Sequence, residues 1–357
     1  PSQFKIVYDA AKYSTSGANH RRAQLYARAS LGQLDRATLR NEIEQKRNQD
    51  KLRAYSLLPV TIVEAKECYL FLQQFLKQSK QFGAQRRASE AAAVEMAIQN
   101  LAEQVSSGNA TQFMWQMENE RFLELEQYFS PQTIDDVELQ LVQQETGKIQ
   151  LSINKAGKNL KSVPKKIAKN AQVVAMQEAR KELMEQYSRT RLQLERAMCE
   201  EALFDSELIY LLANNSTFEQ LFSKLVWMQA DQFYMLKKSA FVSVNNEVVK
   251  VTGNVQIAHP YHLYEAGVWR AWQHHAFTAK WKQPFKQLFR ELYLVTEDEK
   301  QKSATNRFEG YQVQPNKAIT LLKSRGWKTG YYEPLRKISY HYNTITVIDF
   351  IYDFLTA

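Results

Sequence analysis

The spacing of apolar residues changes once along the chain, near residue 137. Up to about residue 135, apolar side chains recur with the 3.6-residue period of an α-helix, and beyond it they first alternate with polar side chains, as in a β-strand. The first part predicts helices at 20–31, 35–57, 63–81, 88–105 and 111–129. Pro59 and Pro131 follow two of these helices, and proline ends a helix because it lacks the backbone N–H and clashes with the preceding turn.

The alternating pattern predicts two β-hairpins. Apolar residues alternate at 137–141 and at 149–153 on either side of the turn Glu145-Thr146-Gly147. A second hairpin is expected at 241–251 around Asn245-Asn246, because asparagine tolerates the positive φ of tight turns. Between the hairpins, the pattern predicts a lysine-rich loop at 154–169 and helices at 173–201, 208–212 and 217–236.

The last part of the chain mixes both periods. An aromatic helix is expected at 261–279, and Pro284 is expected to begin another that runs to about residue 293, since proline is favoured in the first turn. Residues 310–354 predict short strands with one helix at 315–325.

These elements predict an α+β fold. A predominantly helical N-terminal lobe would comprise residues 1–135, and a mixed C-terminal lobe with short antiparallel hairpins would comprise residues 136–357. Within the second lobe we expect three parts, namely the hairpin and lysine-rich loop at 136–170, helices at 171–236 and an α+β segment at 237–357.

The composition is that of a folded chain, because 44% of the residues are hydrophobic and 12% are aromatic. Cys68 and Cys199 are the two cysteines, and their separation fits neither a disulfide framework nor a zinc site, so we expect a reducing, cytoplasmic location. Both lie in apolar helical segments, and Cys199 is expected to be buried and slow to react with thiol reagents. No apolar stretch is long enough to span a membrane, and no signal-peptide pattern is present. The chain begins with Pro1 and ends in an apolar run, so we expect it to be a piece of a longer protein.

Positive charge is concentrated near the N-terminus. The net charge of +9 arises from 47 basic and 38 acidic side chains, and residues 1–60 contain eleven of the basic against five of the acidic ones. Basic side chains with tyrosines between them can hold a nucleic-acid backbone and stack bases. The candidate nucleic-acid-binding residues are Arg21, Arg22, Arg28, Arg40 and Arg47. Solvated surface charge is the alternative interpretation, and no helix-turn-helix or RNP signature specifies a nucleic-acid fold.

Four of the six histidines lie within seventeen positions: His259, His262, His274 and His275. Imidazole side chains bind zinc and transfer protons near neutral pH. The segment contains no H-E-x-x-H pattern and no nearby cysteine, so no metal and no cofactor are expected.

One cleft could gather residues from this part of the chain. His259 is expected at a strand end, Gln283-Pro284 at a helix start and 307–310 at a strand entry, so the candidate catalytic residues are His259, Arg290, Arg307 and Glu309. Arginine and carboxylate groups in one cleft bind anions or perform acid–base chemistry. The alternative is structural, with His259 bonded to the backbone of the strand-to-helix turn and the arginines in salt bridges.

Seven short stretches, in this order, resemble the bacterial MolR-like domain of unknown function (DUF4132), a family of long proteins. The stretches are Arg53-Ala54-Tyr55-Ser56-Leu57-Leu58-Pro59, Leu72-Gln73-Gln74-Phe75-Leu76-Lys77-Gln78-Ser79-Lys80-Gln81-Phe82-Gly83, Ala88-Ser89-Glu90, Leu225-Val226-Trp227, Ile257-Ala258-His259-Pro260, Gln283-Pro284-Phe285-Lys286-Gln287-Leu288-Phe289-Arg290 and Arg307-Phe308-Glu309-Gly310. The resemblance spans roughly residues 20–350. It implies no chemistry that can be assigned to particular residues.

The sequence favours a non-catalytic interaction or scaffold module of a larger MolR-like bacterial protein, with an unidentified protein partner. This interpretation depends on the extended helical surface and on the absence of nucleotide-binding, metal and triad motifs from the sequence. Two alternatives stay open, a nucleic-acid-associated accessory protein and an enzyme of unknown reaction with a cleft near His259, Arg290 and Arg307.

Overall fold

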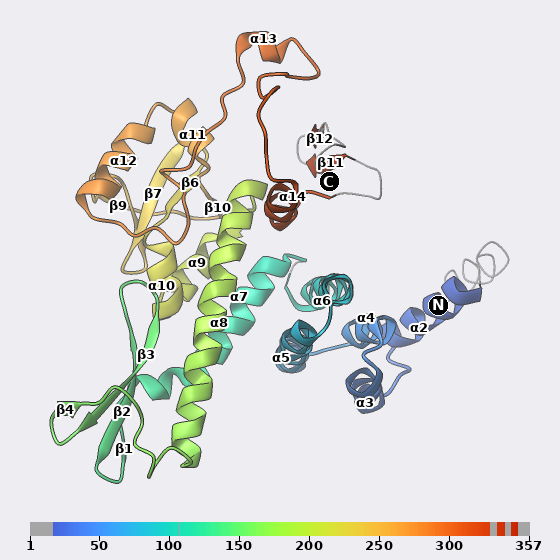
Figure 1. The fold of residues 1–357 in the computed structure, drawn as a ribbon, viewed down its shortest axis with the longest axis vertical. Helices are drawn as coiled ribbons and strands as arrows, with labels where there is room; N and C mark the ends of the chain where they lie inside the picture. Colours follow the sequence, from blue (N-terminus) through green and yellow to red (C-terminus); the bar gives the residue numbers. More distant parts are fainter. Residues whose placement is uncertain (1–16, 107, 329–333, 340–343, 349–357) are drawn as a thin grey trace. The chain divides into compact units, whose positions relative to one another are not determined.

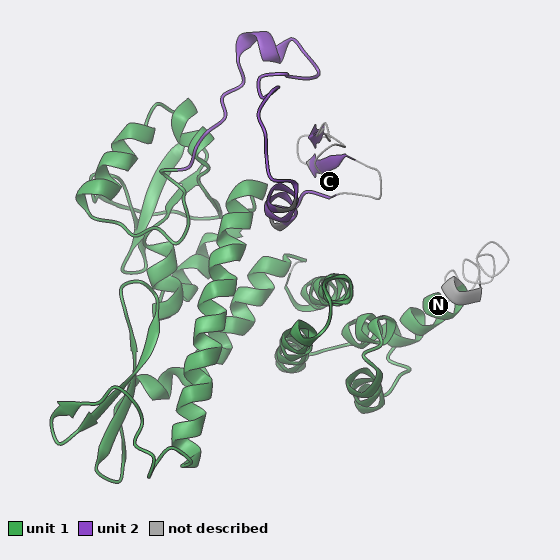
Figure 2. Cartoon of the chain, viewed as in Figure 1, with its two compact units in different colours: residues 1–289 green, residues 290–357 purple. Residues whose placement is uncertain are grey.

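The computed structural model describes residues 17–106, 108–328, 334–339 and 344–348 (Figure 1). The chain forms two compact units, residues 1–289 and residues 290–357 (Figure 2). Helices dominate the N-terminal part, and antiparallel sheets follow in the C-terminal part, so the predicted α+β class is confirmed. No helix among the described residues is long and apolar enough to cross a membrane.

The N-terminal part consists of helices that begin at polar capping residues. The side chains of Asp35, Asn48, Thr61 and Asn109 each accept a hydrogen bond from a backbone N–H of the first turn, which stabilises the start of the helix that follows. The elements are α2 (Gly17–Ser30), α3 (Arg36–Lys46), α4 (Gln49–Leu57), α5 (Ile62–Gln78), η1 (Ser79–Gln81), α6 (Ala84–Val105), α7 (Ala110–Leu125) and η2 (Glu126–Phe129).

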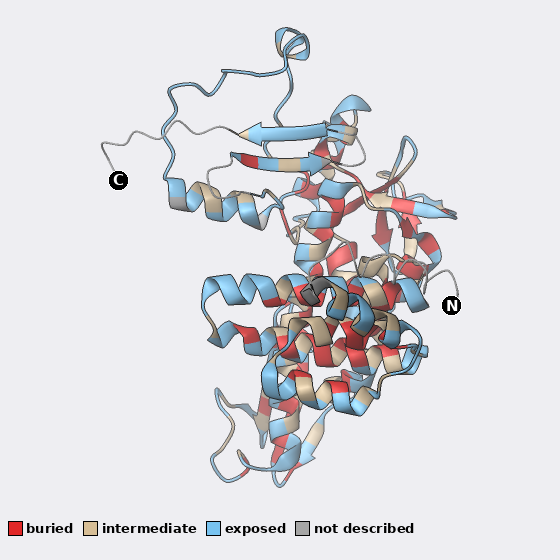
Figure 3. Cartoon of the chain, turned by 90° about the vertical axis from the view of Figure 1, so that its right-hand side faces the viewer, coloured by how far each residue is buried: buried red, intermediate tan, exposed pale blue. Residues whose placement is uncertain are grey.

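The first hydrophobic core lies among these helices. It is built mainly from leucine, alanine and aromatic side chains of α3 to α7, including Leu52, Tyr69 and Phe113. Figure 3 marks these buried positions in red among exposed positions in pale blue on the same helices.

The predicted helix at 35–57 is instead two helices, α3 and α4. Arg47 adopts a left-handed backbone conformation with φ of 49°, and Asn48 then caps a new helix. A left-handed residue interrupts the helical hydrogen-bond pattern, although side-chain periodicity continues across it. The break places the Arg47 side chain against α5 and α6.

The first predicted hairpin is confirmed. Strands β1 (Gln132–Ile134), β2 (Val137–Gln143), β3 (Ile149–Lys155) and β4 (Lys158–Asn159) form an antiparallel sheet, and the buried residues of β2 alternate with exposed ones. The long helix α8 (Ala171–Glu200) covers this sheet through Val173, Met176 and Leu183. Phe122 and Leu125 of α7 share the same core, so the hairpin is packed against helices from both predicted lobes.

A second, six-stranded sheet has the order β5-β10-β6-β7-β8-β9. Trp227 and Leu236 pack on one side with α8, α9 and α10, whereas Val226 and Met235 pack on the other with α11 and α12, because successive side chains of a strand point to opposite faces. The elements are β5 (Phe204–Asp205), α9 (Ser206–Leu212), α10 (Ser216–Phe222), β6 (Val226–Gln229), β7 (Gln232–Lys237), β8 (Ala240–Val242), β9 (Val248–Val249), β10 (Asn254–Ile257), α11 (Pro260–Glu265) and α12 (Trp269–Thr278).

Among this sheet and the helices on it, one prediction is confirmed, one is wrong beyond Phe222, and one is confirmed in part. The hairpin around Asn245-Asn246 is present as β8 and β9, with φ of 65° at Asn246. The predicted helix at 217–236 ends at Phe222 and continues as β6 and β7, since the apolar run there is buried on both faces of a sheet. The predicted helix at 261–279 is divided at Gly267, where φ is 71°.

The helix predicted to begin at Pro284 is absent; residues 284–289 form bends and turns, and residues 290–293 are irregular. The fully buried Gln287 explains this conformation, because its side chain accepts from Val226 N and donates to the carbonyl oxygens of Val226 and Ala258. These hydrogen bonds satisfy the buried amide and backbone groups at the ends of two segments, and buried polar groups without partners cost free energy.

The second unit contains α13 (Glu297–Lys300), α14 (Pro315–Ser324) and the antiparallel pair β11 (Leu335–Ser339) and β12 (Thr344–Ile348). The predicted helix at 315–325 is therefore confirmed. Residues 307–310 form a turn and not the predicted entry into a strand. The part of the predicted apolar run at 349–354 lies outside the described residues.

Cys199 is exposed, which contradicts the predicted burial, whereas Cys68 is buried. Ala197 and Met198 face the core of α8, and each further residue rotates about 100° around a helix, so the next position turns toward solvent. The boundary at residue 135 stays a prediction.

Candidate functional site: a basic hollow on the N-terminal helices

A hollow of about 640 Å³ opens on the N-terminal helices, and every side chain that lines it is polar or charged. Helix α4 and the turn before it supply most of the lining, α2 adds one arginine and α6 adds three residues. The lining residues are Arg22, Arg47, Asn48, Gln49, Asp50, Arg53, Gln85, Arg86 and Ser89.

Arg47 lines the hollow and forms an ion pair with the buried Glu90. The Arg47 Nη2 atom lies 2.7 Å from Glu90 Oε2, and the two side chains are 10% and 0% exposed. Arg47 also donates to Gln78 Oε1 and to the carbonyl oxygen of Phe75, and its guanidinium stacks on the Phe75 ring at 3.8 Å. This arginine is fixed by contacts on several sides and its charge is directed inward.

The Glu90 carboxylate is held in its ionised form. Burial alone would raise its pKa, but hydrogen bonds from Arg47, Ser79 and Arg86 outweigh burial and lower the pKa to about 2. At neutral pH Glu90 is therefore an ionised structural anchor for two arginines.

Asp50, which lines the hollow, likewise contacts two arginines. Its carboxylate lies 3.1 Å from Arg22 Nε and 3.1 Å from Arg53 Nη1, and it accepts a hydrogen bond of 3.2 Å from the Tyr26 hydroxyl. The Ser89 hydroxyl donates to Gln49 Oε1 at 2.8 Å. The side chains of the hollow are thus oriented by one another.

Arg22 and Arg86 differ from Arg47 in their exposure. Their side chains are 48% and 50% exposed, and each contacts a carboxylate through Nε, Arg22 with Asp50 and Arg86 with Glu90. The Nη groups of both arginines donate no hydrogen bond within the part of the chain that the structure describes. These groups can therefore bind an anion from solvent.

Only two of the five candidate nucleic-acid-binding arginines, Arg22 and Arg47, line the hollow. Arg40 lies on α3, pairs with Glu44 at 3.2 Å and stacks on Phe71. Arg21 and Arg28 are exposed positions of α2 outside the lining.

Arg53 belongs to the basic N-terminal cluster but not to the five candidate arginines, and sequence reasoning did not select Arg86. Arg86 had a detectable signal, since Arg86 and Glu90 are four residues apart on one helix, a spacing that brings such side chains together. That Glu90 would be buried beneath Arg47 depends on how α6 packs, which the spacing does not reveal.

His259 has the structural position that the sequence allowed as an alternative. It caps the start of α11, and its Nδ1 accepts a hydrogen bond from Tyr261 N at 3.2 Å. The Nδ1 atom of His262 in turn accepts a hydrogen bond from the backbone N–H of His259, and its Nε2 atom lies 3.5 Å from Glu201 Oε1. Proline at position 260 suits this first turn.

The other three candidate catalytic residues belong to the second unit. The guanidinium of Arg307 lies over the Tyr293 ring at 5.1 Å and 3.8 Å from Glu299 Oε2, and Glu309 is exposed in the turn. Arg290 begins that unit. The convergence of Arg290, Arg307 and Glu309 on His259 stays a prediction. Within the described residues, no group of three or more histidine, cysteine or acidic side chains is arranged to hold a metal ion.

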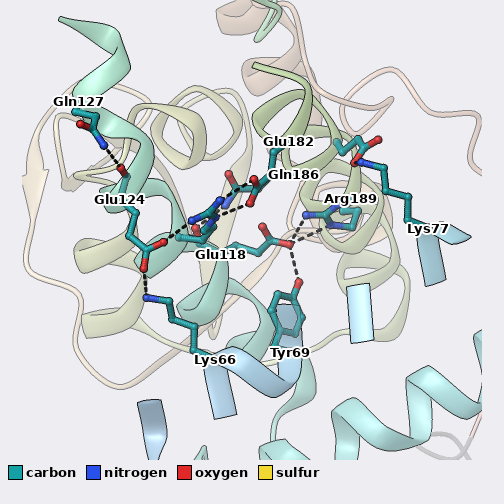
Figure 4. Close-up of polar contacts among 11 residues, drawn as sticks. Lys66, Tyr69, Lys77, Glu118, Glu124, Gln127, Glu182, Gln186 and Arg189 are labelled. Carbon is teal, nitrogen blue, oxygen red and sulfur yellow. Dashed lines mark hydrogen bonds and ion pairs between the residues drawn. The ribbon is translucent and has the colours of Figure 1, made fainter. Parts of the chain in front are cut away.

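A separate polar network holds α7 between α5 and α8 (Figure 4). The buried Glu118 Oε1 accepts from the Tyr69 hydroxyl at 2.6 Å and from Arg189 Nε and Nη2 at 3.0 and 2.7 Å. Burial, followed by the negative charge of Glu118, raises the pKa of Tyr69 well above its usual value. Because its donors and acceptors are paired with one another, this network is interpreted as structural.

Family models match two separate parts of the chain. Residues 1–117 match a family of unknown function (DUF5724), and residues 157–327 match a domain of unknown function (DUF4132). The second match confirms the DUF4132 resemblance over residues 157–327. The three stretches quoted between residues 53 and 90 lie instead in the part that matches DUF5724, a family that the sequence reasoning did not suggest. No curated protein and no solved structure matches the chain.

Proposed function

We propose that this chain is a non-catalytic interaction module of a larger MolR-like bacterial protein, and that the basic hollow binds an acidic segment of a partner protein. The observation that carries the proposal is the pair Arg22 and Arg86, whose guanidinium groups are oriented by carboxylates and yet half exposed. Oriented arginines lose little conformational entropy when they bind a carboxylate or phosphate.

The chemistry of the hollow supports binding and not catalysis. The Ser89 hydroxyl donates to an amide oxygen, which is not a base that would activate it as a nucleophile. Glu90 has a pKa of about 2 and accepts hydrogen bonds from three side chains, so it cannot exchange a proton near neutral pH. Asp50 is engaged by Arg22, Arg53 and Tyr26.

The test is binding of a fluorescein-labelled peptide of ten glutamates to the full chain at low salt, measured by fluorescence anisotropy. Arg22→Gln and Arg86→Gln together should weaken binding about tenfold or more, because a hydrogen bond to a charged group contributes about 1.5 kcal/mol. Arg87→Gln is the matched control, since Arg87 is exposed on the same helix but does not line the hollow. Equal losses in both variants would refute a specific role for the hollow.

A nucleic-acid-associated role is the second candidate, favoured by the exposed Arg21 and Arg28 beside Arg22 on α2. Two features disfavour it. No aromatic side chain lines the hollow to stack a base, and Arg47 is enclosed, with its side chain 10% exposed and paired with Glu90. Salt-sensitive retention on DNA or RNA that is lost when Arg21, Arg22 and Arg28 are changed to Glu, but kept in Arg86→Gln, would support this second role over the first.

A further inference from the structure

We infer that the group which the hollow accepts is a phosphate monoester dianion, carried by a side chain of the partner protein or by a small phosphorylated polyol. This inference rests on the proposed function and specifies the chemistry of the ligand. It is supported by the orientation of two arginines, the charge balance of the hollow and the composition of its lining.

The orientation of Arg22 and Arg86 favours a group with several oxygens. Each guanidinium is engaged at Nε by a carboxylate, at 3.1 Å for Arg22 and 3.0 Å for Arg86, so the two Nη groups form the edge that remains for a ligand. The two arginines come from different helices, α2 and α6, that both border α4. A tetrahedral phosphate offers three terminal oxygens in different directions and can therefore accept from arginines on more than one side, whereas a carboxylate has two oxygens in one plane.

The charge balance matches a dianion. Four guanidinium groups line the hollow, and the carboxylates of Asp50 and Glu90 contact them, which leaves a surplus of two positive charges. A phosphate monoester has a charge between about −1.5 and −2 at pH 7, whereas a single carboxylate has a charge of −1. The phosphate neutralises the surplus more completely.

The lining selects a polar ligand body. No aliphatic or aromatic side chain lines the hollow, and Asn48, Gln49, Gln85 and Ser89 present amide and hydroxyl groups. Most pockets for small molecules are lined mainly by apolar side chains. A phosphate attached to a peptide or to a polyol therefore fits this surface better than a nucleotide, whose base requires an apolar or aromatic contact.

The test compares three ligands by isothermal titration calorimetry on the full chain: a Gly-Ser-rich heptapeptide with one phosphoserine, the same peptide with glutamate in that position, and glucose 6-phosphate. The phosphopeptide should bind about tenfold or more tightly than the glutamate peptide, since charge-assisted contacts to a dianion are stronger. Arg22→Gln and Arg86→Gln should each abolish most of this difference, and Arg87→Gln should leave it unchanged.

Arg22→Lys separates geometry from charge. It retains the positive charge but not the planar pair of donors, so it should weaken phosphopeptide binding severalfold. Arg22 is half exposed on a surface helix, so its substitution does not remove a core side chain, and thermal unfolding of each variant checks the fold.

The outcomes distinguish the inference from the proposed function. Equal binding of the glutamate peptide and the phosphopeptide overturns the phosphate inference and leaves the interaction module in place. Binding of neither peptide nor glucose 6-phosphate overturns both. Binding of glucose 6-phosphate with the same dependence on Arg22 and Arg86, but not of the phosphopeptide, supports the phosphate chemistry, assigns it to a small metabolite and overturns the protein partner.

Discussion

Arg47 and Glu90 connect the break between α3 and α4 to α5, η1 and α6. Arg47 lies at the break between α3 and α4, contacts Phe75 and Gln78 of α5 and Ser79 of η1, and pairs with Glu90 of α6. Removing one partner of such an enclosed pair leaves the other charge without compensation. The remaining charge then costs more free energy than the pair itself contributes.

Glu90→Gln should therefore lower the free energy of unfolding by about 3 kcal/mol. Glu44→Gln is the control, because Glu44 pairs with Arg40 on the exposed face of α3 and its loss should cost about 0.5 kcal/mol or less. Urea unfolding followed by circular dichroism measures both. A loss for Glu90→Gln no larger than that of the control would show that the pair contributes little.

The contribution of Glu90 should also depend on pH. Its pKa falls from 4.5 to about 2 on folding, so the stabilisation is complete above pH 4.5 and is lost as the pH falls through 2. The difference in unfolding free energy between the wild-type chain and Glu90→Gln should therefore shrink between about pH 4.5 and pH 2. A difference that stays constant over this range contradicts the assignment.

The two cysteines should react with thiol reagents at very different rates. Cys199 is exposed, whereas Cys68 is buried and its burial raises the pKa of the thiol. The thiolate is the reactive form, so both effects slow Cys68. With Ellman's reagent, about one equivalent should react rapidly in the native chain and the second after unfolding. Cys199→Ser should remove the rapid phase, and rapid reaction in that variant would contradict the burial of Cys68.

The sequence indicated that the N-terminal helices present arginines that could bind anions, but not which of these arginines line the hollow. Arg22 and Arg47 were identified because basic residues cluster near the N-terminus. Whether an arginine is turned inward, as Arg47 is, or half exposed, as Arg22 is, depends on which carboxylate packs beside it. Those contacts join residues up to 43 positions apart, which periodicity cannot detect.

At the scale of elements, Gly147 in the turn between β2 and β3 allows a close approach of α8. Its φ is 76°, and a Cβ atom there would lie 2.1 Å from ring atoms of Tyr187. Gly157 has a similar φ of 78° but open space around it. Substitution of Gly157 therefore tests the cost of the positive φ alone, whereas substitution of Gly147 adds a steric clash with Tyr187.

Gly157→Ala should lower the unfolding free energy by about 1 kcal/mol, because alanine is strained at positive φ. Gly147→Ala should cost at least about 1 kcal/mol more, since the new methyl group must displace the Tyr187 ring. Thermal or urea unfolding measures the difference. In a chain that already contains Tyr187→Ala, Gly147→Ala should cost no more than Gly157→Ala does. An equal loss for the two glycine substitutions in the otherwise unchanged chain would contradict the close contact.

Helices and strands could be predicted where one hydrophobic period dominated the sequence. The predictions were wrong where contacts with distant parts of the chain determine the local conformation. The hairpin at 137–153 has one buried face, so strict alternation identified it. Residues 226–228 and 234–236 are buried on both faces of a sheet, and such apolar runs are equally consistent with a helix. The segment after Pro284 follows the buried Gln287 amide, whose partners lie in another part of the chain.

At the scale of the whole molecule, limited digestion tests the predicted division near residue 135. Trypsin should cut first within residues 154–169, where Lys158, Lys161 and Lys165 are exposed around β4 and the loop after it. Mass spectrometry of the first fragments identifies the position. Initial cleavage near residue 290, with the lysine-rich loop intact, would favour the boundary between the two compact units instead.

Glu118 also bears on how the chain evolved. Its donors are Tyr69, within the segment that matches DUF5724, and Arg189, within the segment that matches DUF4132, while Glu118 itself follows directly after the first segment. The two segments are therefore not interchangeable parts. Loss of Arg189 with the second segment would leave the buried Glu118 without its cation, and loss of Tyr69 with the first would remove a hydrogen-bond donor to the same carboxylate. Across related chains, substitutions at positions 69, 118 and 189 should occur together. Independent variation at these three positions would indicate that the segments were inherited separately.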